Sequence, residues 1–324
     1  MPNLRGGKEE KRLPNSLFSK KSKAVFFTIL AGALWGTSFP IIKIGLETID
    51  PFTFVFWRFL ISSVTLLSAM LLLHKFSLKI PNKKLIILLG IANATGYLMQ
   101  FVGMPYTTAA KAALFINLSA LWVALLSSKL LGEVLSRKKA VGVLFGLVGI
   151  IFVSTNLDFA ALGQLQLVGD LLLIISGVVW ALFMVYNKKL VMNSTSETFQ
   201  SMTWVLIFTF LSIIPFTVFS APGFFSLSGW GWAAIAWTAI VCWVIPYYLW
   251  LEGLKHLSAS TSTVLLLSEI VVAVVASIVV LKEPLTVFSS IGSLLIIVAI
   301  SLVSVNDSHS LSKKKMSCAL SDDA

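Results

Sequence analysis

Runs of about twenty apolar residues recur along the whole chain, separated by short polar segments. A helix of that length spans a hydrocarbon core of roughly 30 Å. Hydrophobic residues make up 57% of the 324 residues and charged residues only 12%, which is too little charge to cover the surface of a soluble domain. We therefore predict an all-α polytopic membrane protein that is embedded in the lipid bilayer.

The apolar runs define ten predicted transmembrane helices. Basic residues gather in alternate loops between them, as in the group from Arg137 to Lys139, and Lys282 is the exception among the loop cations. Because basic loops stay in the cytoplasm, we expect the segments 1–23 and 306–324 to be cytoplasmic tails of a multi-pass plasma-membrane protein. The predicted helices cover residues 24–46, 51–73, 85–105, 108–130, 139–155, 168–187, 199–220, 230–251, 259–281 and 285–305.

The sequence repeats itself with two constant shifts. A shift of 150 positions relates three residues of the first half, Gly103, Glu133 and Gly142, to the same residue types in the second half. A shift of 145 does the same for Gly32 and Trp35. Repeats of this kind indicate two similar units, here residues 24–155 and 168–305. Five helices per unit is an odd number, so the units insert with opposite orientation into one bundle, the usual architecture of secondary transporters.

Other classes of protein lack support in the sequence. The formal charge of +11 is spread over loops, so it does not indicate nucleic-acid binding. Cys242 and Cys318 are the two cysteines, and neither a disulfide framework nor a metal or cofactor site is implied. The chain has no Gly-x-x-x-x-Gly-Lys, His-Glu-x-x-His or Gly-x-Ser-x-Gly motif, which argues against an internal ATPase and against an enzyme.

Four short motifs carry a resemblance to a known family. The segment 34–39 reads LWGTSF with Lys43 beyond it, Arg58 lies in a WRF motif, and Leu-x-Glu motifs end at Glu133 and Glu283. In this order and spacing, the chain resembles the EamA-type transporters of the drug/metabolite transporter superfamily over about residues 24–305. The resemblance implies that a small organic metabolite moves through a central cavity by alternating access. Amino acids and related compounds, often exported, are the commonest substrates that it implies.

The sequence departs from this family at two positions. Family members commonly carry a proline in the middle of the fourth and ninth helices, where this chain has Ala120 and Ile270. Proline removes a backbone donor and kinks a helix, so both helices are expected to be straighter here. A glutamate commonly lies beside the second of these prolines, and Glu269 matches it.

Ionisable residues inside a membrane are expensive, about 2.5–3.5 kcal/mol on insertion scales, and indicate function. Glu269 lies near the middle of the ninth helix and is predicted to bind a substrate amine, to carry a proton or to anchor a helix. Lys43 is a candidate cation for a substrate carboxylate, with snorkelling to the interface as the alternative. For Arg58, near the acidic turn 47–50, we expect a structural ion pair or a backbone clamp. Lys111 is expected to snorkel.

A polar stripe follows the third helix, because Asn93, Tyr97 and Gln100 lie on one helical face. The shift of 150 maps this stripe onto an aromatic face of the eighth helix, of which we expect Trp250 to be an interfacial belt residue. Interhelical hydrogen bonds are the alternative to cavity lining. Gly32 and Gly36 are expected to serve helix packing. The predicted substrate site comprises Trp35, Lys43, Asn93, Tyr97, Gln100, Asn117, Trp180, Trp243, Tyr247 and Glu269.

These residues would suit a zwitterion with a flat or apolar side chain. A carrier of nucleotide-like, nucleotide-sugar or S-adenosylmethionine-type substrates is the first alternative, although phosphates require more inward cations than this sequence offers. A membrane-embedded enzyme or a non-transporting assembly factor is the alternative from another class. The sequence leaves the oligomeric state open, a homodimer included.

Overall fold

The structure is a computed structural model that describes residues 15–106, 112, 115–134, 136–155, 167–193, 198–220, 224–281, 286–288, 290–299 and 301–302. Within these residues the regular structure is entirely helical. The α-helices are α1 Asn15–Gly36, α2 Ser38–Gly45, α3 Pro51–Leu72, α4 Lys83–Gly103, α6 Ser119–Leu131, α7 Arg137–Thr155, α8 Leu167–Asn193, α9 Thr198–Ile213, α10 Gly229–Ala239, α11 Ile245–Leu254, α12 Ala259–Leu266 and α13 Ser268–Leu281. Three tighter or wider segments join them: η1 Met104–Tyr106, η4 Ile214–Phe219 and the π-helical η5 Ile240–Val244.

Seven helical stretches among the described residues are long and apolar enough to cross a membrane. They agree with seven of the predicted helices, which confirms a multi-pass membrane protein. Of the other three predicted helices, 108–130 and 285–305 include positions outside the described residues, and 139–155 lies within α7, which is not among the seven stretches, so the count of ten stays a prediction. The seven stretches are Lys20–Gly45, Pro51–Leu72, Lys83–Tyr106, Val168–Met192, Thr198–Phe219, Gly229–Leu254 and Ala259–Val280.

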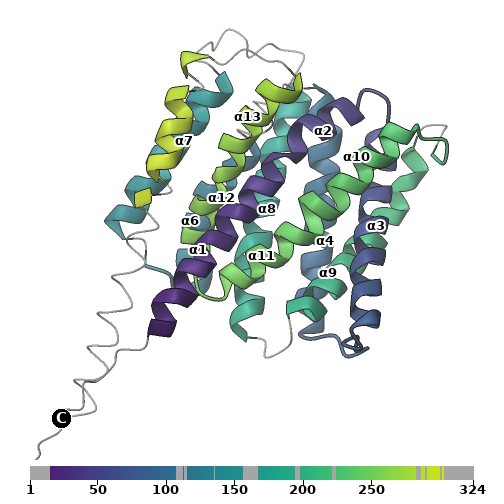
Figure 1. The fold of residues 1–324 in the computed structure, drawn as a ribbon, viewed down its shortest axis with the longest axis horizontal. Helices are drawn as coiled ribbons and strands as arrows, with labels where there is room; N and C mark the ends of the chain where they lie inside the picture. Colours follow the sequence, from purple (N-terminus) through teal and green to yellow (C-terminus); the bar gives the residue numbers. More distant parts are fainter. Residues whose placement is uncertain are drawn as a thin grey trace, which may run out of the picture.

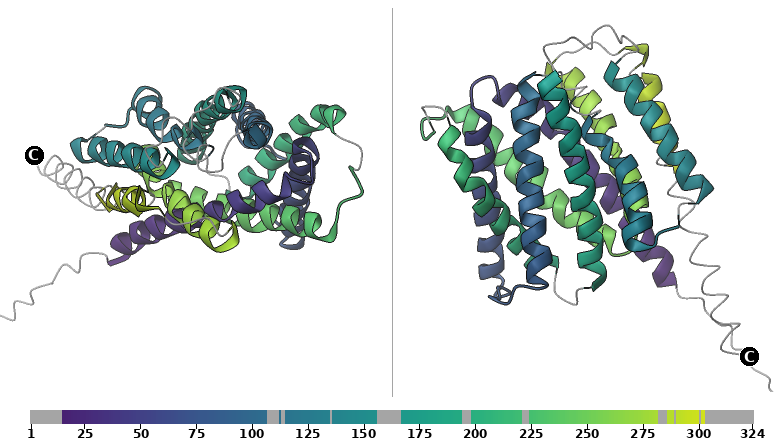
Figure 2. Two further views of the ribbon diagram at one scale, coloured as in Figure 1. Left: turned by 90° about the horizontal axis from the view of Figure 1, so that it is seen from above. Right: turned by 180° about the vertical axis from the view of Figure 1, so that it is seen from behind.

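The two halves of the chain form one bundle (Figure 1). Helix α1 packs against α11, α12 and α13 of the second half, and α4 of the first half packs against α8 and α9. The view from behind shows α4 and α8 running side by side (Figure 2). Because the helices of each half contact mainly those of the other, neither half forms a separate core. The central space between them therefore belongs to both halves.

Glycines at related positions of the two halves make close helix crossings. A Cβ atom on Gly32 of α1 would lie 2.8 Å from the carbonyl oxygen of Leu266. A Cβ atom on Gly177 of α8 would lie 3.2 Å from the carbonyl oxygen of Ile116. The shift of 145 relates the two glycines, and the shift of 150 relates the two residues they meet. Each half thus places its first helix on the equivalent turn of the other half, and the predicted packing role of Gly32 is confirmed.

Both of the helices that lack the family's proline are nevertheless interrupted. The interruptions are turns at Leu118 and Leu267, just before Ala120 and Ile270, so neither helix is continuous although it lacks the proline. At the second turn the backbone N–H of Ile270 bonds to the carbonyl three residues back, at 3.0 Å. The hydroxyl of Ser268 donates to a carbonyl oxygen of α1 at 2.9 Å. The break between α12 and α13 therefore lies where Ser268 contacts α1. In family members with a proline at this place, the proline itself would break the helix.

The first Leu-x-Glu motif ties the two halves together at the start of α12. One carboxylate oxygen of Glu133 accepts the backbone N–H of Ala259 at 2.6 Å. The other accepts the backbone N–H and the hydroxyl of Ser260, at 3.2 and 2.7 Å. An anion at this position satisfies amides that have no partner within the helix and complements the helix dipole. The equivalent Glu283 lies outside the described residues.

We expect Gly177→Ala to destabilise the protein by about 1–3 kcal/mol, since overpacking at a close crossing forces the backbones apart. The new methyl group would lie 2.6 Å from the carbonyl oxygen of Phe115. Gly229→Ala is the matched control, because nothing lies within 4 Å of its added Cβ. Thermal unfolding of the purified variants in detergent measures the difference. Equal unfolding midpoints for the two variants would contradict the proposed role of the crossing.

Glu133→Gln should lower the free energy of unfolding by about 1–2 kcal/mol, because the amide keeps the size of the carboxylate but loses its charge at the helix N-terminus. Glu47→Gln serves as the control, since Glu47 is exposed. Denaturant unfolding in the same detergent compares the two variants. A Glu133→Gln protein as stable as the control would show that the cap contributes nothing.

Candidate functional site

A cavity of about 60 Å³ lies at the centre of the bundle, with room for a few water molecules. Both halves of the chain line it, and seven of the ten predicted site residues are among the lining residues. The lining comprises Trp35, Ser38, Tyr97, Gln100, Ile116, Asn117, Ser119, Trp180, Phe183, Met184, Trp243, Trp250 and Glu269.

Equivalent positions of the two halves meet at this cavity. The shift of 145 relates two lining pairs and the shift of 150 relates two more. One pair consists of identical residues and the other three pairs differ in chemistry, so the cavity is symmetric in position but not in the side chains that line it. These pairs are Trp35 with Trp180, Ser38 with Phe183, Gln100 with Trp250, and Ser119 with Glu269.

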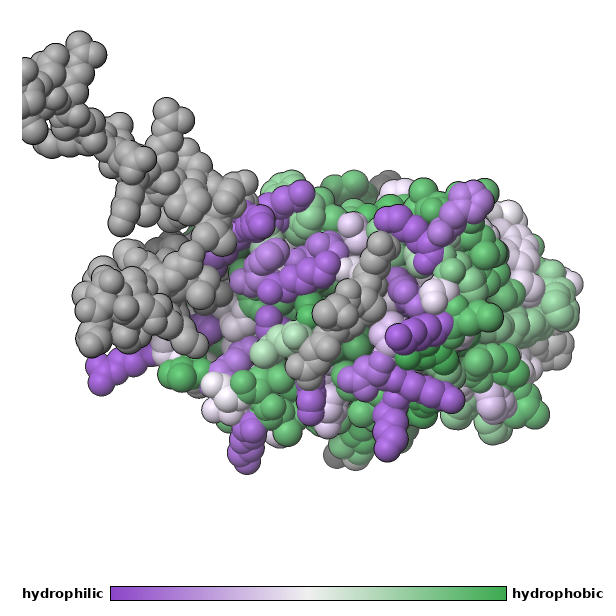
Figure 3. Space-filling model, turned by 90° about the horizontal axis from the view of Figure 1, so that it is seen from below, coloured by the Kyte–Doolittle hydropathy of each residue, from purple (hydrophilic) through white to green (hydrophobic). Residues whose placement is uncertain are grey.

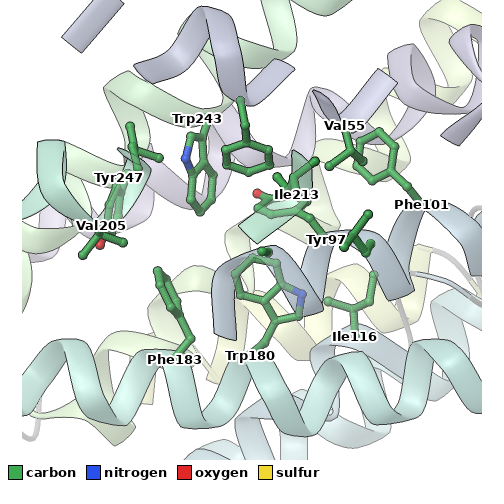
Figure 4. Close-up of a cluster of buried hydrophobic side chains, with 14 of the residues drawn as sticks. Val55, Tyr97, Phe101, Ile116, Trp180, Phe183, Val205, Ile213, Trp243 and Tyr247 are labelled. Atoms are coloured by element: carbon green, nitrogen blue, oxygen red, sulfur yellow. The ribbon is translucent and has the colours of Figure 1, made fainter. Parts of the chain in front are cut away.

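Six of the 13 lining residues are aromatic. The ring of Tyr97 meets Trp180 and Trp243 edge to face, with centroids 4.8 and 4.9 Å away. Trp35 stacks on Trp243 at 5.9 Å. Figure 4 shows Tyr97, Trp180 and Trp243 converging from different helices. Such edge-to-face and stacked pairs fix the rings relative to one another.

The same wall carries unused hydrogen-bond donors. The indole N–H groups of Trp35, Trp180 and Trp243 are buried and have no acceptor among the described residues. A buried donor without an acceptor costs free energy. The wall therefore offers both π faces and donors to a molecule that carries acceptor groups.

Glu269 provides the only acidic side chain among the described residues that line the cavity. It lies in the first turn of α13, immediately after the interruption at Leu267, and the helix dipole favours a carboxylate there. Its side chain lines the cavity and is half-buried. Within the described part of the chain it has neither a hydrogen-bond nor an ion-pair partner, so it is available to a ligand cation or a proton.

Three predicted site residues lie outside the lining, and two of them, Lys43 and Asn93, make polar contacts with neighbouring segments of the chain instead. Lys43 donates to the backbone carbonyl of Met104 at 3.4 Å. Asn93 is fully buried, and its amide donates to the hydroxyl of Thr209 at 3.0 Å. For Asn93 the structure thus shows the alternative reading, an interhelical hydrogen bond.

Two residues of the aromatic face exchange their expected roles. Tyr247 is outside the lining, where its hydroxyl donates to the side-chain oxygen of Asn187 at 3.0 Å and its ring backs onto the cavity wall. Trp250 is not an interfacial belt residue, because it is 1% exposed and lines the cavity. Its indole N–H donates to the hydroxyl of Ser262 at 2.8 Å. The 150-residue shift relates Trp250 to Gln100, a predicted site residue, and this relation is the feature of the sequence that indicated a cavity position for Trp250.

Arg58 does not form the expected ion pair with the acidic turn before it. Asp50 instead caps α3 by accepting two backbone N–H groups. The guanidinium of Arg58 lies over the ring of Tyr97, 4.6 Å from its centroid, and 6.0 Å from that of Trp243. One of its nitrogens is 3.5 Å from the Tyr97 hydroxyl and 3.5 Å from the carbonyl oxygen of Cys242. Arg58 therefore contacts a backbone carbonyl, as one of the two expectations had it. No acidic side chain among the described residues forms an ion pair with it.

Known proteins support the family resemblance. The sequence pattern of the EamA-like transporter family matches residues 22–155 and again residues 167–305. An uncharacterized transporter of Archaeoglobus fulgidus is 29% identical over 288 residues, which cover 87% of this chain and 97% of that protein. The uncharacterized transporter YyaM of Bacillus subtilis is 28% identical over 281 residues, covering 85% and 90% of the two chains.

A solved crystal structure shares the fold at 20% sequence identity, with a TM-score of 0.73 over 89% of this chain and 98% of that chain. This likeness concerns the fold alone. The two family matches together span most of the chain, and the similar proteins are transporters rather than enzymes. The chain belongs to the EamA-like transporter family of multi-pass membrane proteins.

Proposed function

We propose that this protein is a secondary transporter that moves a small organic metabolite, an amino acid or a related compound, across the cytoplasmic membrane by alternating access, in the direction of export. One observation carries the proposal: Glu269, which has no polar partner among the described residues, lies in a central cavity that both family-matched segments line. Sites of this kind lie at the interface of repeats in transporters. Membership of the transporter family supports it further.

The orientation follows from the distribution of charge. Figure 3 looks onto the lower end of the bundle and shows hydrophilic side chains gathered there, with hydrophobic ones around the flanks. The connections that follow α3 and α11 contain Lys75, Lys79 and Lys255. By the positive-inside rule, this end faces the cytoplasm and both tails lie there, in a protein of ten helices arranged as two inverted repeats.

The proposed substrate follows from the lining. Glu269 would hold an ammonium group, and a charge-assisted hydrogen bond of this kind is among the strongest in proteins. The amides of Gln100 and Asn117 add polar contacts, and the rings accept a flat or apolar side chain. The small volume of the cavity means that the rings must move when the substrate binds.

The alternative substrates differ in how well their charges match this site. Among the described residues that line the cavity there is no Lys, Arg or His, and the carboxylate repels phosphates, so nucleotides and nucleotide sugars are disfavoured. A cationic adenosyl compound such as S-adenosylmethionine suits both the carboxylate and the rings. It therefore stays the second candidate.

Glu269→Gln should reduce substrate counterflow in proteoliposomes about 10–100-fold, because a hydrogen bond to a charged group is worth about 1.5–3 kcal/mol. Amino acids, polyamines, nucleosides and S-adenosylmethionine form the substrate panel, measured with and without a pH gradient. Glu47→Gln, at an exposed position, should transport like the unmodified protein.

Acceleration by the pH gradient that Glu269→Gln abolishes would identify Glu269 as the coupling residue. Acceleration that persists in the variant would place proton coupling elsewhere. Undiminished counterflow by a well-folded Glu269→Gln protein would contradict the proposed binding role.

A further inference from the structure

Arg58 is a second ionisable side chain in the centre of the bundle that has no acidic partner among the described residues. It is 1% exposed and carries the planar, delocalised positive charge of a guanidinium. Its Nε and Nη1 atoms have no hydrogen-bond acceptor among the described residues. The remaining nitrogen makes only two long contacts of 3.5 Å. A buried cation in this state lacks the partner that normally compensates its desolvation.

The aromatic rings around Arg58 only partly compensate its charge. Four ring centroids lie within 6.0 Å of the guanidinium carbon, those of Phe59, Tyr97, Phe101 and Trp243. The π face of a ring attracts a cation, but it does not replace an oxygen acceptor for each N–H group. The surroundings therefore hold the charge in place and leave its hydrogen-bonding capacity unused.

Only single rings separate this charge from the cavity. Tyr97 and Trp243 each lie beside Arg58, and both line the cavity. Glu269 lines the same cavity as these two rings. Arg58 and Glu269 thus lie against the same wall, one behind it and one on its cavity side. A molecule with one charge of each sign would complement both.

The backbone next to Arg58 is irregular at the same place. Pro246 has no N–H group, so the carbonyl of Cys242 lacks its usual α-helical donor, and Arg58 approaches that carbonyl instead. The surrounding turn is π-helical, and the N–H of Ile245 bonds to the carbonyl of Ile240, five residues back. Such wide turns recur at functional sites. This one carries Trp243, the ring that covers Arg58 on the cavity side.

We propose that Arg58 is the carboxylate subsite of the transported zwitterion, reached when Tyr97 and Trp243 shift as the substrate enters. The carboxylate occupies the unused guanidinium donors, an arrangement that arginine favours, while Glu269 holds the ammonium group. Lys43, the cation suggested by the sequence, lies outside the cavity lining. This inference rests on the proposed function and adds to it the residue that selects amino acids over simple amines.

The test compares each amino acid with its own decarboxylated amine as competitors of counterflow. Leucine with isoamylamine and phenylalanine with phenethylamine are the probes, because both side chains suit an apolar wall. The readout is the ratio of half-inhibitory concentrations, amine over amino acid. The unmodified protein should prefer the amino acid at least tenfold. A ratio near one for the unmodified protein would overturn the proposal without any variant.

Arg58→Gln should lower this ratio at least tenfold, and Arg58→Lys should lower it less, because lysine keeps the charge but not the fork of donors. Arg137→Gln is the matched control, since Arg137 is exposed at the start of α7, and it should leave the ratio unchanged. In a folded Arg58→Gln protein, the half-inhibitory concentrations of the amino acid and of the amine could instead rise by the same factor. That result would show that Arg58 only supports the wall, and the proposal would fail.

Failure of the proposed function gives a different result. In that case neither the amino acids nor the amines compete in the unmodified protein, and no ratio exists to measure. Size-exclusion profiles and unfolding midpoints establish that each variant is folded. If Arg58→Gln does not fold, Arg58→Lys and the ratio of the unmodified protein still decide the matter.

Discussion

The close approach of each half's first helix to the interrupted helix of the other half is the contact on which the cavity depends. Lipid offers no hydrophobic force to hold helices together, so small residues and good packing do so. Gly32 meets the turn before Glu269, and Gly177 meets the turn before Ser119. These crossings fix both turns at the centre of the bundle, and the first residues after each turn line the cavity. A larger residue at either glycine would push the turn, and its polar side chain, out of place.

The centre of the bundle keeps two unpaired charges at a cost. Arg58 and Glu269 could each be replaced by an apolar residue with a gain in stability, because a buried charge without a partner loses its hydration. Neither is paired within the described residues, and each lies against the aromatic wall of the cavity. The wall itself retains indole donors without acceptors. These features agree with a binding site in which a ligand supplies the opposite charges and the hydrogen-bond acceptors.

Much of this arrangement could be read from the sequence, because the shifts that relate the halves also relate cavity positions. The tryptophans Trp35 and Trp180 were predicted in this way, whereas Glu269 was predicted as an ionisable residue near the middle of an apolar helix. The spacing of Asn93 and Tyr97 gives a common helical face, but it does not say which part of that face meets a neighbouring helix. Sequence proximity likewise suggested a pair between Arg58 and the acidic turn, whereas Asp50 is used as a helix cap. Partners across the bundle depend on helix rotation, which no spacing specifies.

The positions of the two charges also bear on how binding could drive movement. Arg58 belongs to α3 in the first half, whereas Glu269 belongs to α13 in the second. On the proposals above, a zwitterion joins the two halves through one charge at each end. A ligand shifts a conformational equilibrium only by its difference in affinity for the states. A substrate that bridges the halves loses one of its contacts when the halves move apart, so its affinity differs between the two states. A simple amine held by Glu269 alone contacts one half, and its affinity does not change in this way. Selectivity for the carboxylate and coupling to movement would then have the same physical origin.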